Sequence, residues 1–211
     1  MAHLVLLGDS IFDNARYTDR GPDVISQVRQ LLNLDWQATL LAVDGATTEH
    51  IPAQLVRMPL SASHIVLSVG GNNAIENMAL LHMPATSASD VLLEMARISS
   101  TFEEEYRSVV KACRQVGLPL TLCTIYNGNF VDEDLKRKVL IALMAFNDVI
   151  LRTGIEFGLA MIDLRLVCSA SSDYANAIEP SSAGGAKIAR AIVNSMASDR
   201  SPQGGARVFI T

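Results

Sequence analysis

The stretch HLVLLGDS (residues 3–10) decides the fold of this 211-residue chain. It begins with an almost continuous apolar run instead of a strict alternation of apolar and polar residues. Such a run is typical of a strand that is buried on both faces of a parallel sheet. Glycine, aspartate and serine follow at once, where the strand is expected to end.

Four further runs have the same character, at 37–44, 64–70, 119–126 and 159–164, and helical patterns separate them. The helical spacing of apolar residues is found over 22–32, about 90–116, about 133–157 and from about Ser182 onward. This alternation predicts an α/β fold: a three-layer α/β/α sandwich with a five-stranded parallel sheet. We expect a single domain over 1–199 and a C-terminal tail over 200–211.

The sequence also predicts the cap of one helix and the character of one long connection, and a structure can test both. Ser100 and Glu103 have the spacing of a helix-capping box inside the second helical pattern. Residues 74–90 are longer than a usual connection, so they could form a flap.

Composition limits the class of function. Apolar residues make up 49% of the chain and the mean hydropathy is +0.26, which excludes a disordered protein. The longest apolar run, VLIALMAF (139–146), is far shorter than the ~18 residues of a membrane span. A net charge of −5 argues against nucleic acid as a partner. We therefore expect a small molecule or another protein as partner; the sequence specifies no oligomeric state.

Cysteine usage indicates the compartment. Cys113, Cys123 and Cys168 are an odd number and lack the spacing of metal ligands. Reduced thiols in a cytoplasmic protein are the simplest interpretation, and we expect neither a metal nor a cofactor.

Small and polar residues follow every predicted strand. They are GDS (8–10), DGATT (44–48), GGNN (70–73), YNGN (126–129) and, after the fifth strand, NAIEPSSAGG (176–185). Ligands of an open parallel sheet bind beyond the carboxyl ends of its strands, so these loops should converge on one site.

Three of these residues suit acyl transfer. Ser10 is the candidate nucleophile, and its own N–H at a helix start could face an oxyanion. Gly45 offers a second backbone N–H that a substrate can approach, and Asn72 a third donor through its amide. Three donors around a serine form an oxyanion hole. Each residue alone is equally consistent with a turn or a helix cap, and their occurrence at successive strand ends favours catalysis.

Three sequence blocks resemble the SGNH, or GDSL, hydrolase superfamily, and the resemblance covers essentially the whole chain. GDSIFDN (8–14) matches the first block in Gly-Asp-Ser, VDGATT (43–48) resembles the second through Gly45, and GGNN (70–73) resembles the third through Asn72. Members of this superfamily are serine esterases, lipases and deacetylases with a flavodoxin-like fold. The resemblance therefore implies that fold and a serine hydrolase.

The fourth block departs from the superfamily pattern. Where that pattern has Asp-x-x-His before a proline, this chain has NAIE (176–179). Asn176 thus replaces the orienting aspartate and Glu179 replaces the histidine base, while Asn73 replaces the usual aspartate of the third block. Burial can raise the pKa of a glutamate toward neutrality, and a glutamate needs no second carboxylate behind it. The paired replacement predicts a Ser10–Glu179 dyad.

Two other interpretations stay open. Glu179 could only complement the dipole of the last helix, worth about 0.3–1 kcal/mol, in a protein that has lost catalysis. Alternatively His50, which follows Gly45, or His82, which lies in 74–90, could be the base.

The preferred function is hydrolysis of a small ester through an acyl-Ser10 intermediate. Ser10, Gly45 and Asn72 would hold the oxyanion and Glu179 would be the base, while Asp13, Asn73 and Tyr126 are expected to contact the substrate. The alternative is a catalytically degenerate member that binds a ligand or a protein partner in the same pocket.

Overall fold

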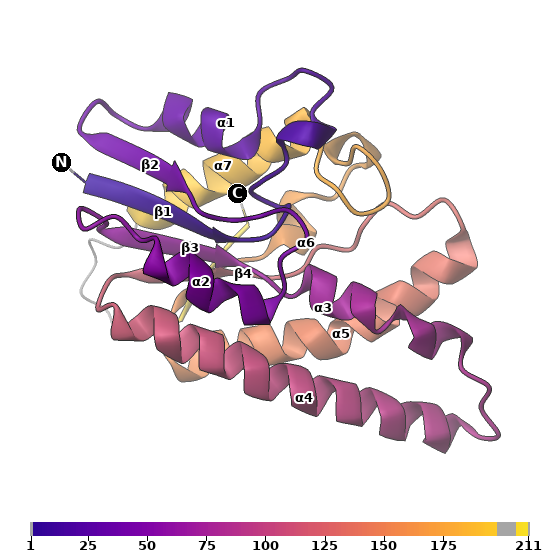
Figure 1. Cartoon of the computed structure of the whole chain (residues 1–211). Helices are drawn as coiled ribbons and strands as arrows, with labels where there is room; N and C mark the ends of the chain where they lie inside the picture. The colour runs from indigo at the N-terminus through magenta and orange to yellow at the C-terminus, as the bar shows by residue number, and fades with distance from the viewer. Residues whose placement is uncertain (1, 198–205, 211) are drawn as a thin grey trace.

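The computed structural model describes residues 2–197 and 206–210 and contains a six-stranded parallel sheet (Figure 1). The strand order is β2-β1-β3-β4-β5-β6. The strands are β1 (Ala2–Gly8), β2 (Trp36–Leu40), β3 (His64–Ser68), β4 (Leu120–Cys123), β5 (Ala160–Ile162) and β6 (Arg207–Phe209).

Helices cover both faces of the sheet, so the predicted three-layer sandwich is confirmed (Figure 1). One face carries α1 (Val24–Leu31), α6 (Leu164–Val167) and α7 (Ser182–Ala197). The other carries α2 (Ile51–Val56), α4 (Ala88–Gln115) and α5 (Glu133–Glu156). Shorter elements are α3 (Gly71–Glu76) and the 3₁₀ segments η1 (Ala15–Tyr17), η2 (Thr48–His50), η3 (Met78–His82) and η4 (Ser171–Asp173). No helix in the described ranges is both long and apolar enough to cross a bilayer.

The expected number of strands is wrong by one. β6 lies inside 200–211, the segment expected to be a tail, and it pairs in parallel with β5 from Ala160↔Arg207 to Ile162↔Phe209. A strand of three residues after a Pro/Gly-containing segment carries too little periodicity to be recognised from sequence.

The continuous apolar run of β1 is explained by two separate cores. Leu4 and Leu6 point to the core under α1 and α7, and Val5 and Leu7 point to the core under α4 and α5. Successive side chains of a strand alternate between the two faces, so a strand covered on both sides needs apolar residues at every position.

Gly8 ends β1 at a place where no side chain fits. A Cβ atom at Gly8 would lie 1.9 Å from the carbonyl oxygen of Ser68, and its φ is +137°. The Gln54 side chain binds both backbone groups of Gly8, accepting from its N–H and donating to its carbonyl, each at 2.8 Å. The start of the loop that carries Ser10 is therefore fixed.

The long helices α4 and α5 are joined by ion pairs. α4 begins with a capping box formed by Ser87 and Asp90, so the capping role expected for Ser100 and Glu103 is wrong, because both lie inside the helix. Glu103 instead accepts from Arg107 at 2.8 Å and from Arg152 of α5 at 2.9 Å. These contacts hold together the two helices that form one side of the site described next.

Candidate active site

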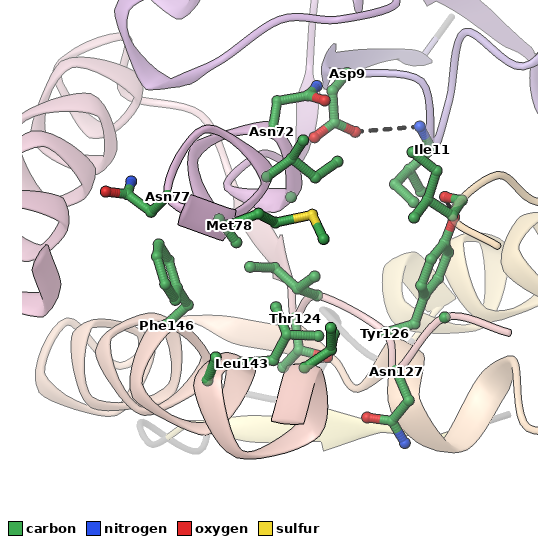
Figure 2. Close-up of a pocket in the computed structure, with 18 of the residues that line it drawn as sticks. Asp9, Ile11, Asn72, Asn77, Met78, Thr124, Tyr126, Asn127, Leu143 and Phe146 are labelled. Carbon is green, nitrogen blue, oxygen red and sulfur yellow. Dashed lines mark hydrogen bonds between the residues drawn. The ribbon is translucent and has the colours of Figure 1, made fainter. Parts of the chain in front are cut away.

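The loops at the carboxyl edge of the sheet surround a cavity of about 100 Å³. Figure 2 shows Asp9 and Asn72 at one end and Leu143 and Phe146 of α5 at the other. Ser10 and Glu179 also line this cavity. The structure thus brings together three of the four predicted catalytic residues.

Ser10 is presented by the turn after β1. The N–H groups of Phe12 and Asp13 both donate to the carbonyl of Asp9 at 3.1 Å, which starts a helical turn at Asp9. Ser10 is 7% exposed. Its backbone N–H donates to no residue in the described ranges, so it is free to bind an oxyanion.

Gly45 and Asn72 are connected, although Gly45 does not line the cavity. Gly45 has a φ of +81° in a turn closed by the 3.0 Å bond from the Ala46 N–H to the Val43 carbonyl, a position that favours glycine. The Asn72 amide donates to the Ala46 carbonyl at 2.9 Å. One amide hydrogen of Asn72 stays available, and the Gly45 N–H donates to no described residue.

Glu179 is buried against Ser10. It is 6% exposed, and burial raises its pKa to about 7, while the nearby Ser10 hydroxyl lowers this pKa by a smaller amount and the charge of Asp44 raises it further. Its Oε2 atom is buried without a hydrogen-bond partner among the described residues. A carboxylate with this pKa can exchange a proton with a serine hydroxyl near neutral pH.

The backbone on both sides of Glu179 is held by side chains. The Asn176 carbonyl oxygen Oδ1 accepts from the N–H groups of Ile178 at 2.9 Å and Glu179 at 3.0 Å. The Tyr126 hydroxyl donates to the Ile178 carbonyl at 2.5 Å. On the other side, the buried Asn14 amide donates to the Pro180 carbonyl at 3.2 Å. Asn176 therefore orders the loop instead of orienting the Glu179 side chain directly.

The three predicted substrate-binding residues have other contacts. Asp13 accepts from the Asp44 N–H at 3.0 Å, and buried Asn73 donates to the Thr48 hydroxyl at 2.8 Å. Neither lines the cavity. Tyr126 does line it, but its hydroxyl is occupied by Ile178.

None of the four histidines of the chain lines the cavity. His50 lies in a separate depression beside Gly45, where its Nδ1 accepts from the Thr47 N–H at 3.1 Å. His82 is exposed at the end of η3. Glu179 is consequently the candidate base that the structure brings to Ser10.

Asp9 is a cavity residue that sequence reasoning missed. It is 3% exposed and its Oδ1 accepts from the Ile11 N–H at 3.1 Å, the dashed bond in Figure 2. Burial raises its pKa to about 7, the Ile11 N–H opposes this, and the charges of Glu179 and Asp44 raise it further. An acid directly after a fully buried strand was the signal that could have identified it.

Much of the remaining cavity wall is apolar. Its largest apolar part comes from η3, α4 and α5, namely Met78, Leu80, Leu81, Met95, Ile98, Val139, Ala142, Leu143 and Phe146. The region expected as a flap, 74–90, contains the end of α3, η3 and the start of α4, and it contributes part of this wall. Among residues 2–197 and 206–210, no three His, Cys, Asp or Glu side chains gather closely enough to hold a metal ion.

Comparisons with known proteins identify the family and the fold of this chain. The model of the GDSL-like lipase/acylhydrolase family matches residues 6–187. An extracellular lipase from Streptomyces rimosus is similar in structure, with a TM-score of 0.67, 15% identity and coverage of 92% of this chain and 99% of that one. A lipase from a goat rumen metagenome has a TM-score of 0.70, 18% identity and coverage of 92% and 97%.

A catalytic mutant of an acetylxylan esterase from Geobacillus stearothermophilus has a TM-score of 0.65, 17% identity and coverage of 92% of this chain and 93% of that one. Likenesses at such identities show a common fold. A search of curated protein sequences gave no match. Since the family model covers most of the sequence, from within β1 to within α7, the chain belongs to the GDSL-like lipase/acylhydrolase family.

Proposed function

We propose that this protein hydrolyses small carboxylic esters through an acyl-Ser10 intermediate. The observation that carries the proposal is the burial of Glu179 in the same cavity as Ser10, which raises the pKa of Glu179 to about 7. Family membership supports a hydrolase, and the apolar wall of η3, α4 and α5 suits the acyl group.

In the first half of the reaction, Glu179 accepts the proton of the Ser10 hydroxyl while its oxygen attacks the ester carbonyl. The negative charge on the carbonyl oxygen is held by the Ser10 N–H and by the free amide hydrogen of Asn72. As the tetrahedral intermediate collapses, its bond to the alcohol oxygen breaks and Glu179 returns the proton to the alcohol.

In the second half, Glu179 accepts a proton from water, which attacks the acyl-Ser10 carbonyl. Collapse of the second intermediate breaks the bond to Ser10, and the proton returns to its oxygen. The acid leaves and the starting state is restored. Glu179 does in both halves what a histidine base does, provided that its pKa stays near the working pH.

The test is turnover of p-nitrophenyl acetate and butyrate against pH, in wild type, Ser10→Ala and Glu179→Gln. Exposed Glu104 provides the matched control, Glu104→Gln. We expect both site variants to lose about 10²–10⁴-fold in kcat and the wild type to lose activity below about pH 7, as Glu179 is protonated.

Labelling of Ser10 by a fluorophosphonate separates this proposal from its alternative. A protein that binds ligands without catalysis would show neither labelling nor turnover above background. If Ser10→Ala abolished turnover while Glu179→Gln kept it, Glu179 would be excluded as the base.

A further inference from the structure

Asp9 is a second carboxyl group in the cavity that holds Glu179, and the mechanism above does not use it. It precedes the nucleophile directly and is almost fully buried. One oxygen is bound to the Ile11 N–H. The Asp9 side chain lies at the same end of the cavity as Asn72 (Figure 2).

In the described part of the chain, no cationic side chain lines the cavity beside these two acids. The residues that line the cavity include Asp9 and Glu179 but no lysine, arginine or histidine. Two unpaired carboxylates in one buried site are strongly unfavourable, and such pairs bind a proton in preference.

The other groups that act on Asp9 do not supply positive charge. Asp44, after β2, adds a third carboxyl group; it accepts from the Tyr17 hydroxyl at 2.9 Å, and Arg16 reaches only to 3.9 Å from it. Tyr126 also faces the pair, and burial raises its pKa well above the ordinary value, so that it stays neutral. The same holds for the Cys123 thiol of β4, whose pKa burial also raises.

We propose that Asp9 and Glu179 hold one proton between them in the working enzyme, with Asp9 neutral and Glu179 ionised. Asp9 is the more deeply buried of the two, which favours its neutral form. The nearby Ser10 hydroxyl favours the ionised form of Glu179. An ionised Asp9 beside Asn72 would repel the oxyanion that Asn72 is to bind. This inference rests on the proposed function and adds a second group whose protonation is required.

The consequence is a bell-shaped dependence of turnover on pH. Activity rises as Glu179 loses its proton and falls again as Asp9 does, and the two apparent pKa values belong to the pair. Asp9→Asn has a permanently neutral amide in place of the neutral acid. Its profile should therefore lose the alkaline limb, whatever its absolute turnover, while Asp35→Asn, at an exposed aspartate before β2, should keep it.

The experiment measures kcat against pH for wild type and these two variants, and follows the side-chain carboxyl signals by ¹³C NMR in the same pH range. Loss of the alkaline limb in Asp9→Asn alone supports the inference. An alkaline limb that persists in folded Asp9→Asn, or its absence in an active wild type, overturns it.

Two further readouts keep the test decisive. If Asp9→Asn does not fold, Asp44→Asn should shift both limbs to lower pH, because a negative charge that raises both pKa values is gone; unshifted limbs overturn the inference. If wild type hydrolyses no ester, the proposed function fails, yet NMR still shows whether one proton is shared. Two independent titrations at ordinary carboxyl pKa values would then refute the sharing.

Discussion

Replacing Asp9 with asparagine should make the protein more stable at alkaline pH. In the folded chain burial raises the pKa of Asp9 from 3.8 to about 7. A carboxyl group whose pKa is raised on folding binds its proton more tightly in the folded state, so its contribution is fully present below the unfolded pKa. That contribution is lost as the pH rises through the folded pKa.

The size of the effect follows from the shift. Each pKa unit corresponds to about 1.4 kcal/mol, so ionising Asp9 between about pH 4 and pH 8 should lower the free energy of unfolding by about 4 kcal/mol. Asp9→Asn has no proton to lose at this position. The difference in unfolding free energy between Asp9→Asn and wild type should therefore change by about 4 kcal/mol, in favour of the variant, between these two pH values.

Urea denaturation followed by circular dichroism at both pH values measures this difference. Asp35→Asn is the control, because it removes an exposed aspartate at the amino end of β2, the edge of the sheet opposite the site. The same difference at both pH values for Asp9→Asn would refute the argument, since it would mean that the folded protein accommodates an ionised Asp9 without penalty.

Two further predictions concern the residues around the site. Tyr126→Phe removes the hydroxyl that binds the Ile178 carbonyl, so steady-state kinetics should show kcat about tenfold lower with little change in KM; Tyr106→Phe, whose hydroxyl has no described partner, is the control. Lys187→Met leaves Asp173, which is 1% exposed, without the ammonium group at 2.8 Å. This should lower the free energy of unfolding by about 2 kcal/mol in urea titrations, less than for a fully buried pair, and an unchanged midpoint would mean that the ion pair contributes nothing.

The fold could be predicted because the signals that determine it are local. A strand buried on both faces must be apolar at nearly every position, and the helices between the strands follow the 3.6-residue period. The long patterns over 90–116 and 133–157 correspond closely to α4 and α5. β6 carries no such signal, because only three residues form it.

The site could be predicted only in part. Ser10, Asn72 and Glu179 were expected close together because the topology of a parallel sheet brings strand ends together, and all three line the cavity. The roles of the side chains around these three residues depend on contacts between residues that are far apart in the sequence. The partner of the Tyr126 hydroxyl lies 52 residues away in sequence, and the environment of Asp9 depends on the absence of any cation from segments far apart in the chain. No local pattern encodes either.

The pairing of β6 with β5 has a consequence for synthesis on the ribosome. Translation proceeds from the N-terminus, and β6 (Arg207–Phe209) is the last element of the sheet to be made. β6 pairs with one edge of β5, and the Asp163 N–H directly after β5 donates to the Phe209 carbonyl. Until residue 209 has left the ribosomal tunnel, this edge of β5 remains open. An open strand edge is a template for pairing with other chains. The rest of the fold, including the Ser10 loop, is synthesised before β6. We therefore expect this edge of β5 to be the part of the nascent protein that needs protection by chaperones for the longest time.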